Sequence, residues 1–139
     1  MINKILLGYD GSPSAQDAFA FALDLATRYG AELHVLGVVR PPEFPEDVET
    51  EAMIESSRQH YANVQGALRD KLAHQSIKAH FDVVVGHPAE QIVRYAEKHA
   101  VDHIVVGHRG RTLFDRWLIG SVARQVIAYA HCAVTVVRT

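Results

Sequence analysis

The residues that most clearly suggest a chemical role lie between Gly107 and Ser121, where Gly107-His108-Arg109-Gly110 is followed by Gly120-Ser121. Glycines allow a backbone to approach a ligand with no Cβ in the way. The residues after Ser121 have a helix-like pattern, and a helix N-terminus offers unpaired N–H groups and a positive dipole end. Together with arginine and the Ser121 hydroxyl, these groups suit a phosphate chain. The alternative is that the glycines serve only turns.

Two better-known phosphate-binding patterns are absent from the sequence. One is the lysine-containing GxxxxGK[ST] loop, and the other is the dinucleotide-binding GxGxxG turn. A nucleotide site in this chain must therefore be of another design.

Histidines are frequent enough to raise a metal hypothesis. The nine are His34, His60, His74, His80, His87, His99, His103, His108 and His131. None belongs to an HExxH motif or to a Cys/His pair with ligand spacing. We expect surface side chains rather than metal ligands, and therefore no metal site. His108 is the exception, because its place in the cationic loop would let it contact phosphate.

Length and composition indicate a single domain over residues 1–139 with a sizeable core. A formal net charge of −2 gives no reason to expect binding to nucleic acid or to an anionic membrane. The single cysteine, Cys132, excludes a disulfide within the chain and fits a reducing cytosol. No apolar run approaches the length of a membrane span. We expect a cytoplasmic protein that does not insert into membranes.

Strand and helix patterns alternate along the chain. Strands are expected over residues 2–9, 32–39, 77–85, 101–106 and 133–137. The first helix begins at Pro13 with Ser12 as its cap and stops at Gly30, and later helices span 48–73 and begin near Pro88 and Ser121. Residues 41–47 are expected to form a loop. This pattern predicts an α/β three-layer sandwich with a parallel sheet of order 3-2-1-4-5.

The strand order predicts where a ligand binds. In such a sheet the order reverses between the first and fourth strands, and ligands occupy the crevice beyond the carboxyl ends of the strands there. Asp10 and Gly107–Gly110 flank that point. The fold and the glycine pattern thus select the same cleft.

Three segments resemble the universal stress protein family. They are Gly107-x2-Gly110-x9-Gly120-Ser121, the opening Lys4–Ser12 and the segment Val84–Glu90. The resemblance is to the nucleotide-binding branch and covers essentially the whole chain. It implies an adenine nucleotide alpha hydrolase-like (Rossmann-like) fold and ATP as the ligand, with Mg²⁺ accompanying the nucleotide. Ala123 stands where some members carry Thr, which would leave ADP or AMP competitive.

The resemblance also implies roles for individual residues. Gly8 and Asp10 would lie beside the adenosine, and the Val38 backbone would read the adenine edge. Gly107, Arg109 and Gly110 would wrap the ribose and α-phosphate, and Gly120, Ser121 and Val122 would bind the outer phosphates. From the residues alone, Asp10 is equally suited to an Asx turn over Gly11-Ser12, and one carboxylate can do both.

No nucleophile–base pair is apparent, and Ser121 lacks a GxSxG elbow. We therefore assign no catalytic residue and expect a nucleotide-dependent stress-response or regulatory protein with at most slow ATP hydrolysis. Nucleotide would order residues 108–117 and part of 41–50 for an unidentified regulatory partner. The alternatives are a nucleotide-free homodimeric interaction module and, ranked lower, an ATP-pyrophosphatase-like enzyme.

The last strand, Ala133–Val137, is expected at an edge of the sheet. An uncovered apolar edge strand invites pairing with another chain. A two-fold homodimer that pairs this strand with its copy would cover the edge, and members of the family that resemble this chain dimerise in this way.

Overall fold

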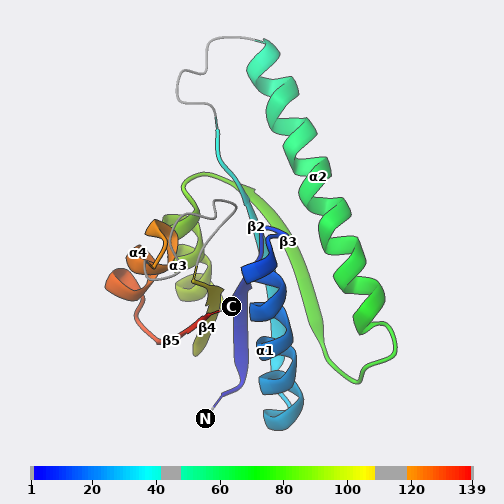
Figure 1. Cartoon of the computed structure of the whole chain (residues 1–139), viewed down its shortest axis with the longest axis vertical. Coiled ribbons are helices and arrows are strands. Elements are labelled where there is room, and N and C mark those ends of the chain that lie inside the picture. Colours follow the sequence, from blue (N-terminus) through cyan, green and yellow to red (C-terminus); the bar gives the residue numbers. More distant parts are fainter. Residues whose placement is uncertain (1, 42–47, 109–118, 139) are drawn as a thin grey trace.

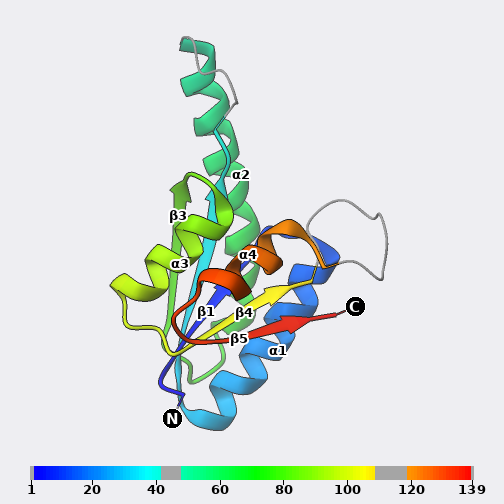
Figure 2. The same ribbon diagram turned by 90° about the vertical axis from the view of Figure 1, so that its left-hand side faces the viewer.

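The sheet contains all five expected strands, and all of them are parallel. The computed structural model describes residues 2–41, 48–108 and 119–138. The strands are β1 (Lys4–Gly8), β2 (Glu32–Val39), β3 (Ala79–Val85), β4 (His103–Gly107) and β5 (Ala133–Val137). Their order, β3-β2-β1-β4-β5, confirms the prediction, and Figure 2 shows the sheet from the side of α3 and α4.

Four helices complete a three-layer sandwich. They are α1 (Pro13–Tyr29), α2 (Val48–Leu72), α3 (Pro88–Lys98) and α4 (Ser121–Tyr129). Helices α1 and α2 cover one face of the sheet, and α3 and α4 cover the other (Figure 1). The first half of α2 extends beyond the carboxyl ends of the strands, next to the predicted ligand crevice.

The central strand β1 explains why the sheet needs both helical layers. Ile5 and Leu7 face the core under α1 and α2, whereas Leu6 faces the core under α3 and α4. All three side chains have no exposed surface. A strand that is buried on both faces is a continuous apolar run rather than an alternating one.

Helix α1 begins and ends where the sequence predicts. The Ser12 Oγ accepts a hydrogen bond from the Ala15 amide at 3.2 Å, and Pro13 occupies the first turn. Gly30 ends the helix in the left-handed conformation with φ of 63°, which costs glycine little. These signals fix the turn that carries Asp10 from β1 into α1.

Three strands begin later than predicted. β1 begins at Lys4 rather than Ile2, and β3 begins at Ala79 rather than Ile77. β4 spans His103–Gly107 instead of residues 101–106, because the Val101 amide donates back to the Ala96 carbonyl at 2.8 Å and closes the end of α3. Most of the expected loop over 41–47 lies outside the described residues. Among the described helices, none is both long and apolar enough to cross a membrane.

Candidate functional site

A cleft of about 880 Å³ lies at the carboxyl ends of the strands, at the predicted switch point between β1 and β4. Its volume is within the range of small-molecule sites. Seven predicted site residues line it: Gly8, Asp10, Val38, Gly107, Gly120, Ser121 and Val122. The other two, Arg109 and Gly110, lie outside the described residues, as do Arg111 and Arg116. The structure therefore brings together every predicted site residue that it describes.

Asp10 forms the Asx turn that the sequence left open. Its Oδ1 accepts a hydrogen bond from the Ser12 amide at 2.9 Å. This bond holds the carboxylate at the mouth of the cleft and uses one of its two oxygens. A carboxylate can accept further hydrogen bonds, so the turn leaves capacity for a ligand hydroxyl.

The backbone of Val38 is oriented by the register of β2. In β2 the Glu32 amide donates to the Asn3 carbonyl, and the Leu36 carbonyl accepts from the Tyr9 amide. The even-numbered residues of β2 therefore direct their backbone N–H and C=O groups toward β1. Because backbone groups alternate sides along a strand, Val38 directs its N–H and C=O the same way. β1 ends at Gly8, which is level with Leu36. Val38 therefore presents one donor and one acceptor to the cleft beyond the end of β1.

The N-terminus of α4 supplies further donors. The amides of Ser121, Val122 and Ala123 have no acceptor within the helix, because the first intrahelical bond runs from Arg124 to the Gly120 carbonyl. The Gly120 amide already donates to the His108 carbonyl at 2.7 Å. This bond ties the start of α4 to the end of β4, and the residues that carry the three unpaired amides line the cleft.

Packing within the protein is tight at both glycines of the strand ends and leaves no room for a Cβ at Gly107. A Cβ on Gly8 would lie 3.0 Å from Ile92 Cδ1 and 3.2 Å from Val106 Cγ1. A Cβ on Gly107 would lie 2.8 Å from the backbone carbon of Ser14, too close for any real contact. These glycines let α3 and α1 approach the strand ends, and this close approach shapes the cleft.

Several cleft residues were not predicted. Arg40 directly follows β2, Tyr61 comes from α2, and Arg124 lies one turn into α4. The position of Arg40 at the carboxyl end of a strand was a usable signal. Tyr61 had none, because its helix lies far from the other cleft residues in the sequence. His108, which the sequence singled out as a possible phosphate contact, also lines the cleft, but it is only 4 % exposed and its Nδ1 lies 3.4 Å from the Ser14 Oγ.

One histidine prediction is wrong. His34 is 5 % exposed rather than a surface residue. It occupies an even position in β2 and therefore shares the sheet face that packs under α3 with Leu36 and Val38. Desolvation by burial, the largest effect, lowers the pKa of His34, and the positive charge of nearby His80 lowers it further. The ring is neutral near pH 7.

These features define an α/β protein with a ligand cleft at the switch point of a doubly wound parallel sheet. The family model of the universal stress protein family matches residues 1–138. The chain belongs to the universal stress protein family.

Individual relatives agree with this assignment. The universal stress protein MJ0531 of Methanocaldococcus jannaschii is 33 % identical over 141 residues, with 99 % of this chain and 83 % of that protein covered. Among solved structures, protein MJ0577 is 30 % identical with a TM-score of 0.90, covering 100 % of this chain and 97 % of that one. Universal stress protein UspA from Lactobacillus plantarum is 28 % identical with a TM-score of 0.85, covering 98 % and 97 %.

Proposed function

We propose that the cleft binds an adenine nucleotide, and that the Val38 backbone recognises the base. The observation that carries this proposal is the donor–acceptor pair which Val38 directs past the end of β1. The Watson–Crick edge of adenine offers an acceptor at N1 next to a donor at N6, so it complements one N–H and one C=O of a single residue. Guanine presents the reverse pattern at these positions and would leave both backbone groups unpaired.

The phosphate chain would lie at the N-terminus of α4. The amides of Ser121, Val122 and Ala123, the Ser121 hydroxyl and the helix dipole all favour negative charge there. Asp10 would accept from the ribose hydroxyls between the base and the phosphates. With a triphosphate, Mg²⁺ would be held mainly by phosphate oxygens and water. We propose ATP as the ligand, with ADP and AMP as competitors.

Structures of the same fold support a nucleotide ligand. A universal stress protein has been solved with cAMP, an Arabidopsis thaliana family protein with AMP, and an Archaeoglobus fulgidus universal stress protein with dAMP. Their identities to this chain are 22 %, 17 % and 20 %, respectively. The shared element is adenine, which is the part of the ligand that the Val38 backbone would read.

The role we propose is regulatory, with at most slow hydrolysis of the nucleotide. The proposal rests on the backbone donors of Val38 and of the start of α4, which suit binding rather than turnover. We further propose that nucleotide acts on residues 108–117 and part of 41–50, most of which lie outside the described residues, and that an unidentified protein partner recognises the change. Limited proteolysis with and without ATP tests this step, and identical cleavage of both segments in the two samples would contradict it.

Native mass spectrometry of the purified protein tests the ligand directly. We expect an added mass equal to one adenine nucleotide per chain, or its appearance after incubation with ATP and Mg²⁺. If no adenylate mass is found before or after incubation, the proposal fails.

We further propose a homodimer through β5 (Ala133–Val137). β5 is an edge of the sheet, and two large apolar side chains of the neighbouring α4 are exposed, Ile127 at 49 % and Tyr129 at 73 %. Val137 directs its carbonyl toward β4, where it accepts from His108, so by alternation Val136 directs its N–H to the open edge.

The orientation of Val136 gives a selective test of the dimer. Val136→Pro removes an outward donor without removing a hydrogen bond to β4, whereas Val136→Ala keeps the donor although it removes more side-chain volume. Sedimentation should show a dimer for Val136→Ala and a weakened dimer for Val136→Pro. Equal dimerisation of the two variants would contradict pairing through this edge.

A further inference from the structure

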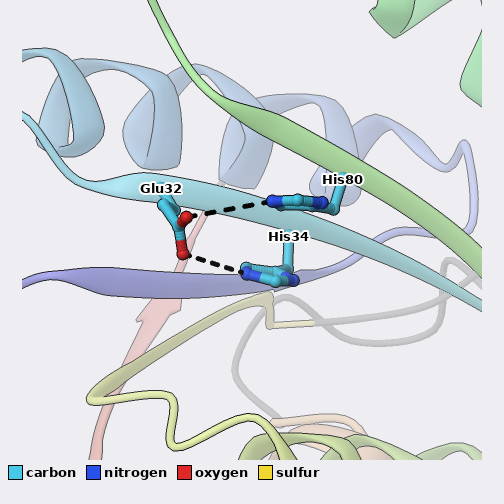
Figure 3. Close-up of side chains that lie close together, drawn as sticks. All are labelled: Glu32, His34 and His80. Atoms are coloured by element: carbon cyan, nitrogen blue, oxygen red, sulfur yellow. Dashed lines mark ion pairs between the residues drawn. The ribbon is translucent and has the colours of Figure 1, made fainter.

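At the opposite end of the sheet, the Glu32 carboxylate lies against the stacked rings of His34 and His80 (Figure 3). Glu32 and His34 are two residues apart in β2, so their side chains lie on the same face. His80 in β3 is the register partner of His34 and lies on that face as well. One ligand atom from each of the three residues lies within 4.8 Å of the other two. The cluster lies at the start of β2, away from the cleft at its carboxyl end.

A chain of two hydrogen bonds, from His34 to the Tyr95 hydroxyl and from that hydroxyl to the Asp82 carboxylate, fixes the tautomer of His34. The Tyr95 hydroxyl donates its only proton to the Asp82 carboxylate at 2.9 Å, because an ionised carboxylate can only accept. The same hydroxyl lies 2.9 Å from His34 Nδ1, so it must accept the Nδ1 proton. Burial raises the pKa of Tyr95, which keeps the hydroxyl protonated. His34 therefore carries its proton on Nδ1 and a lone pair on Nε2.

The lone pair of His34 Nε2 has no hydrogen-bond donor opposite it within the described residues. The atom is buried in a residue that is only 5 % exposed. What faces it is the Glu32 carboxylate, with Oε2 at 3.7 Å. Two acceptors facing each other in a buried setting are unfavourable unless a cation or a proton lies between them. Protonation of His34 is itself opposed by burial.

We propose that Glu32, His34 and His80 form a binding site for Zn²⁺. Two imidazoles and one carboxylate are a known catalytic-type Zn²⁺ donor set, and they leave a fourth position for water. Imidazole nitrogen distinguishes the site from those of Ca²⁺ and Mg²⁺, which prefer oxygen ligands. The chain Asp82–Tyr95–His34 matches the outer-shell arrangement that orients a ligating histidine through its other nitrogen.

The ligand atoms of the three residues lie further apart than Zn²⁺ requires, and the partly exposed side chains of Glu32 and His80 can move to shorten these distances. Tetrahedral Zn²⁺ with bonds of about 2.0–2.1 Å places its ligand atoms roughly 3.4 Å apart. Glu32 Oε1 lies 3.9 Å from His80 Nε2, and the His80 ring is stacked on that of His34 with centroids 4.5 Å apart and planes at 19°. His80 must therefore turn out of this stack to direct its lone pair at an ion held by His34. The side chains of His80 and Glu32 are 43 % and 25 % exposed, which leaves them room to rotate, whereas buried His34 provides the fixed point.

Lys78 competes with the metal for Glu32. Its Nζ lies 3.0 Å from Glu32 Oε1, and its side chain is 70 % exposed. A bound Zn²⁺ would displace this ammonium group into solvent, at the small cost typical of an exposed ion pair. The other groups that affect the charge of the site are Lys4, which acts on Glu32, and His99, whose ring centroid lies 5.7 Å from that of His34.

The test is titration of the full chain with Zn²⁺ alone, followed by calorimetry, and with Co²⁺, followed by visible absorption. We expect one metal per chain and the intense visible bands of four-coordinate Co²⁺. His80→Ala, at an exposed position, should weaken Zn²⁺ binding by at least about tenfold. His131→Ala replaces an exposed histidine elsewhere on the surface and should leave the affinity unchanged.

Two further variants separate a built site from adventitious binding to surface histidines. Lys78→Ala should tighten Zn²⁺ binding because it removes the competitor for Glu32. Tyr95→Phe should weaken it by about tenfold by removing the acceptor that orients His34; its unfolding curve without metal shows whether the variant is folded. The proposal is overturned if His80→Ala and His131→Ala bind Zn²⁺ equally, if Lys78→Ala has no effect, or if wild type binds no metal.

Discussion

The two ends of the sheet differ in which groups they direct toward a ligand. At the carboxyl end, the cleft offers backbone groups: the N–H and C=O of Val38 and the first amides of α4, next to strands that end in glycine. At the amino end, side chains converge: Glu32, His34 and His80. The carboxyl end suits an extended, anionic organic ligand, whereas the amino end suits a compact cation.

This difference follows from the topology. In a parallel sheet the helices begin beyond the carboxyl ends, so helix N-termini and their unpaired amides gather there. At the amino end the helices have just finished, and the chain offers carbonyl groups and side chains instead. The same fold therefore provides opposite electrostatic settings at its two ends. Substitutions that disrupt one end of the sheet at a time test this difference between the two ends.

The largest effect is expected from Gly107→Ala at the carboxyl end. The new Cβ would lie 2.8 Å and 2.9 Å from backbone atoms of Ser14, so α1 and β4 must separate. We expect a loss of about 1–3 kcal/mol of unfolding free energy in urea denaturation, together with weaker adenylate binding. The matched control is Gly66→Ala in α2, where a Cβ meets nothing within 4 Å; it should stabilise by roughly 0.5–1 kcal/mol. Equal effects of the two variants would contradict the close approach at Gly107.

Asp10→Ala should produce the next largest effect, on ligand affinity. It removes the proposed ribose acceptor and the bond to the Ser12 amide. We expect adenylate affinity to fall by about tenfold, or roughly 1.4 kcal/mol, in calorimetric titration. Asp10→Asn keeps a side-chain oxygen that can accept from the Ser12 amide but removes the negative charge. Comparison of the two variants therefore separates the effect of losing the turn from the effect of losing the charge. Zn²⁺ binding at the other end should not change in either variant.

Ser12→Ala tests whether the turn matters for stability alone. It removes the cap that accepts from the Ala15 amide at 3.2 Å. The expected cost is about 1 kcal/mol in unfolding free energy, with adenylate affinity close to that of wild type. A loss of affinity as large as that of Asp10→Ala would show that Ser12 contacts the nucleotide.

The smallest expected effect is the pH dependence of stability that His34 contributes at the amino end. Burial lowers the pKa of His34 in the folded state, so the unfolded chain binds this proton more readily. In metal-free protein, stability should therefore fall as pH drops through about 6.5, the ordinary histidine value. The maximum loss is about 1.4 kcal/mol for each unit separating the folded and unfolded pKa values.

The pH effect has its own control. His103, also with a pKa lowered by burial, contributes in the same direction. His34→Gln should therefore reduce the pH dependence between pH 7 and 5 without abolishing it. An unchanged slope would contradict a neutral, buried His34.

The sequence was sufficient to predict the parallel sheet and its carboxyl-end cleft, because the alternation of strands and helices from which both follow depends on local signals. Strand–helix alternation, the Ser12 cap and Gly30 are all readable within short windows. The start of β4 could not be predicted in this way, because it is determined by a hydrogen bond from the Val101 amide back to α3. The reason for glycine at Gly107 was also hidden, since its neighbour Ser14 is distant in sequence.

The amino-end cluster could not be predicted for a related reason. Glu32 and His34 are two residues apart, which hints at a shared face, but His80 joins them only through the register of β2 with β3. A search for ligand spacing within one segment cannot detect a pair formed across strands. The same register buries His34, which made the expectation of a surface histidine wrong.

Recognition of adenine by backbone groups at the carboxyl end is tested by calorimetric titration of Val38→Pro against Val38→Ala. Proline removes the N–H directed at the cleft without removing a hydrogen bond to β3, whereas alanine keeps that N–H. We expect wild type and Val38→Ala to bind ATP in preference to GTP, and Val38→Pro to lose this preference. No heat with any adenylate in wild type, or an unchanged preference in Val38→Pro, would contradict it.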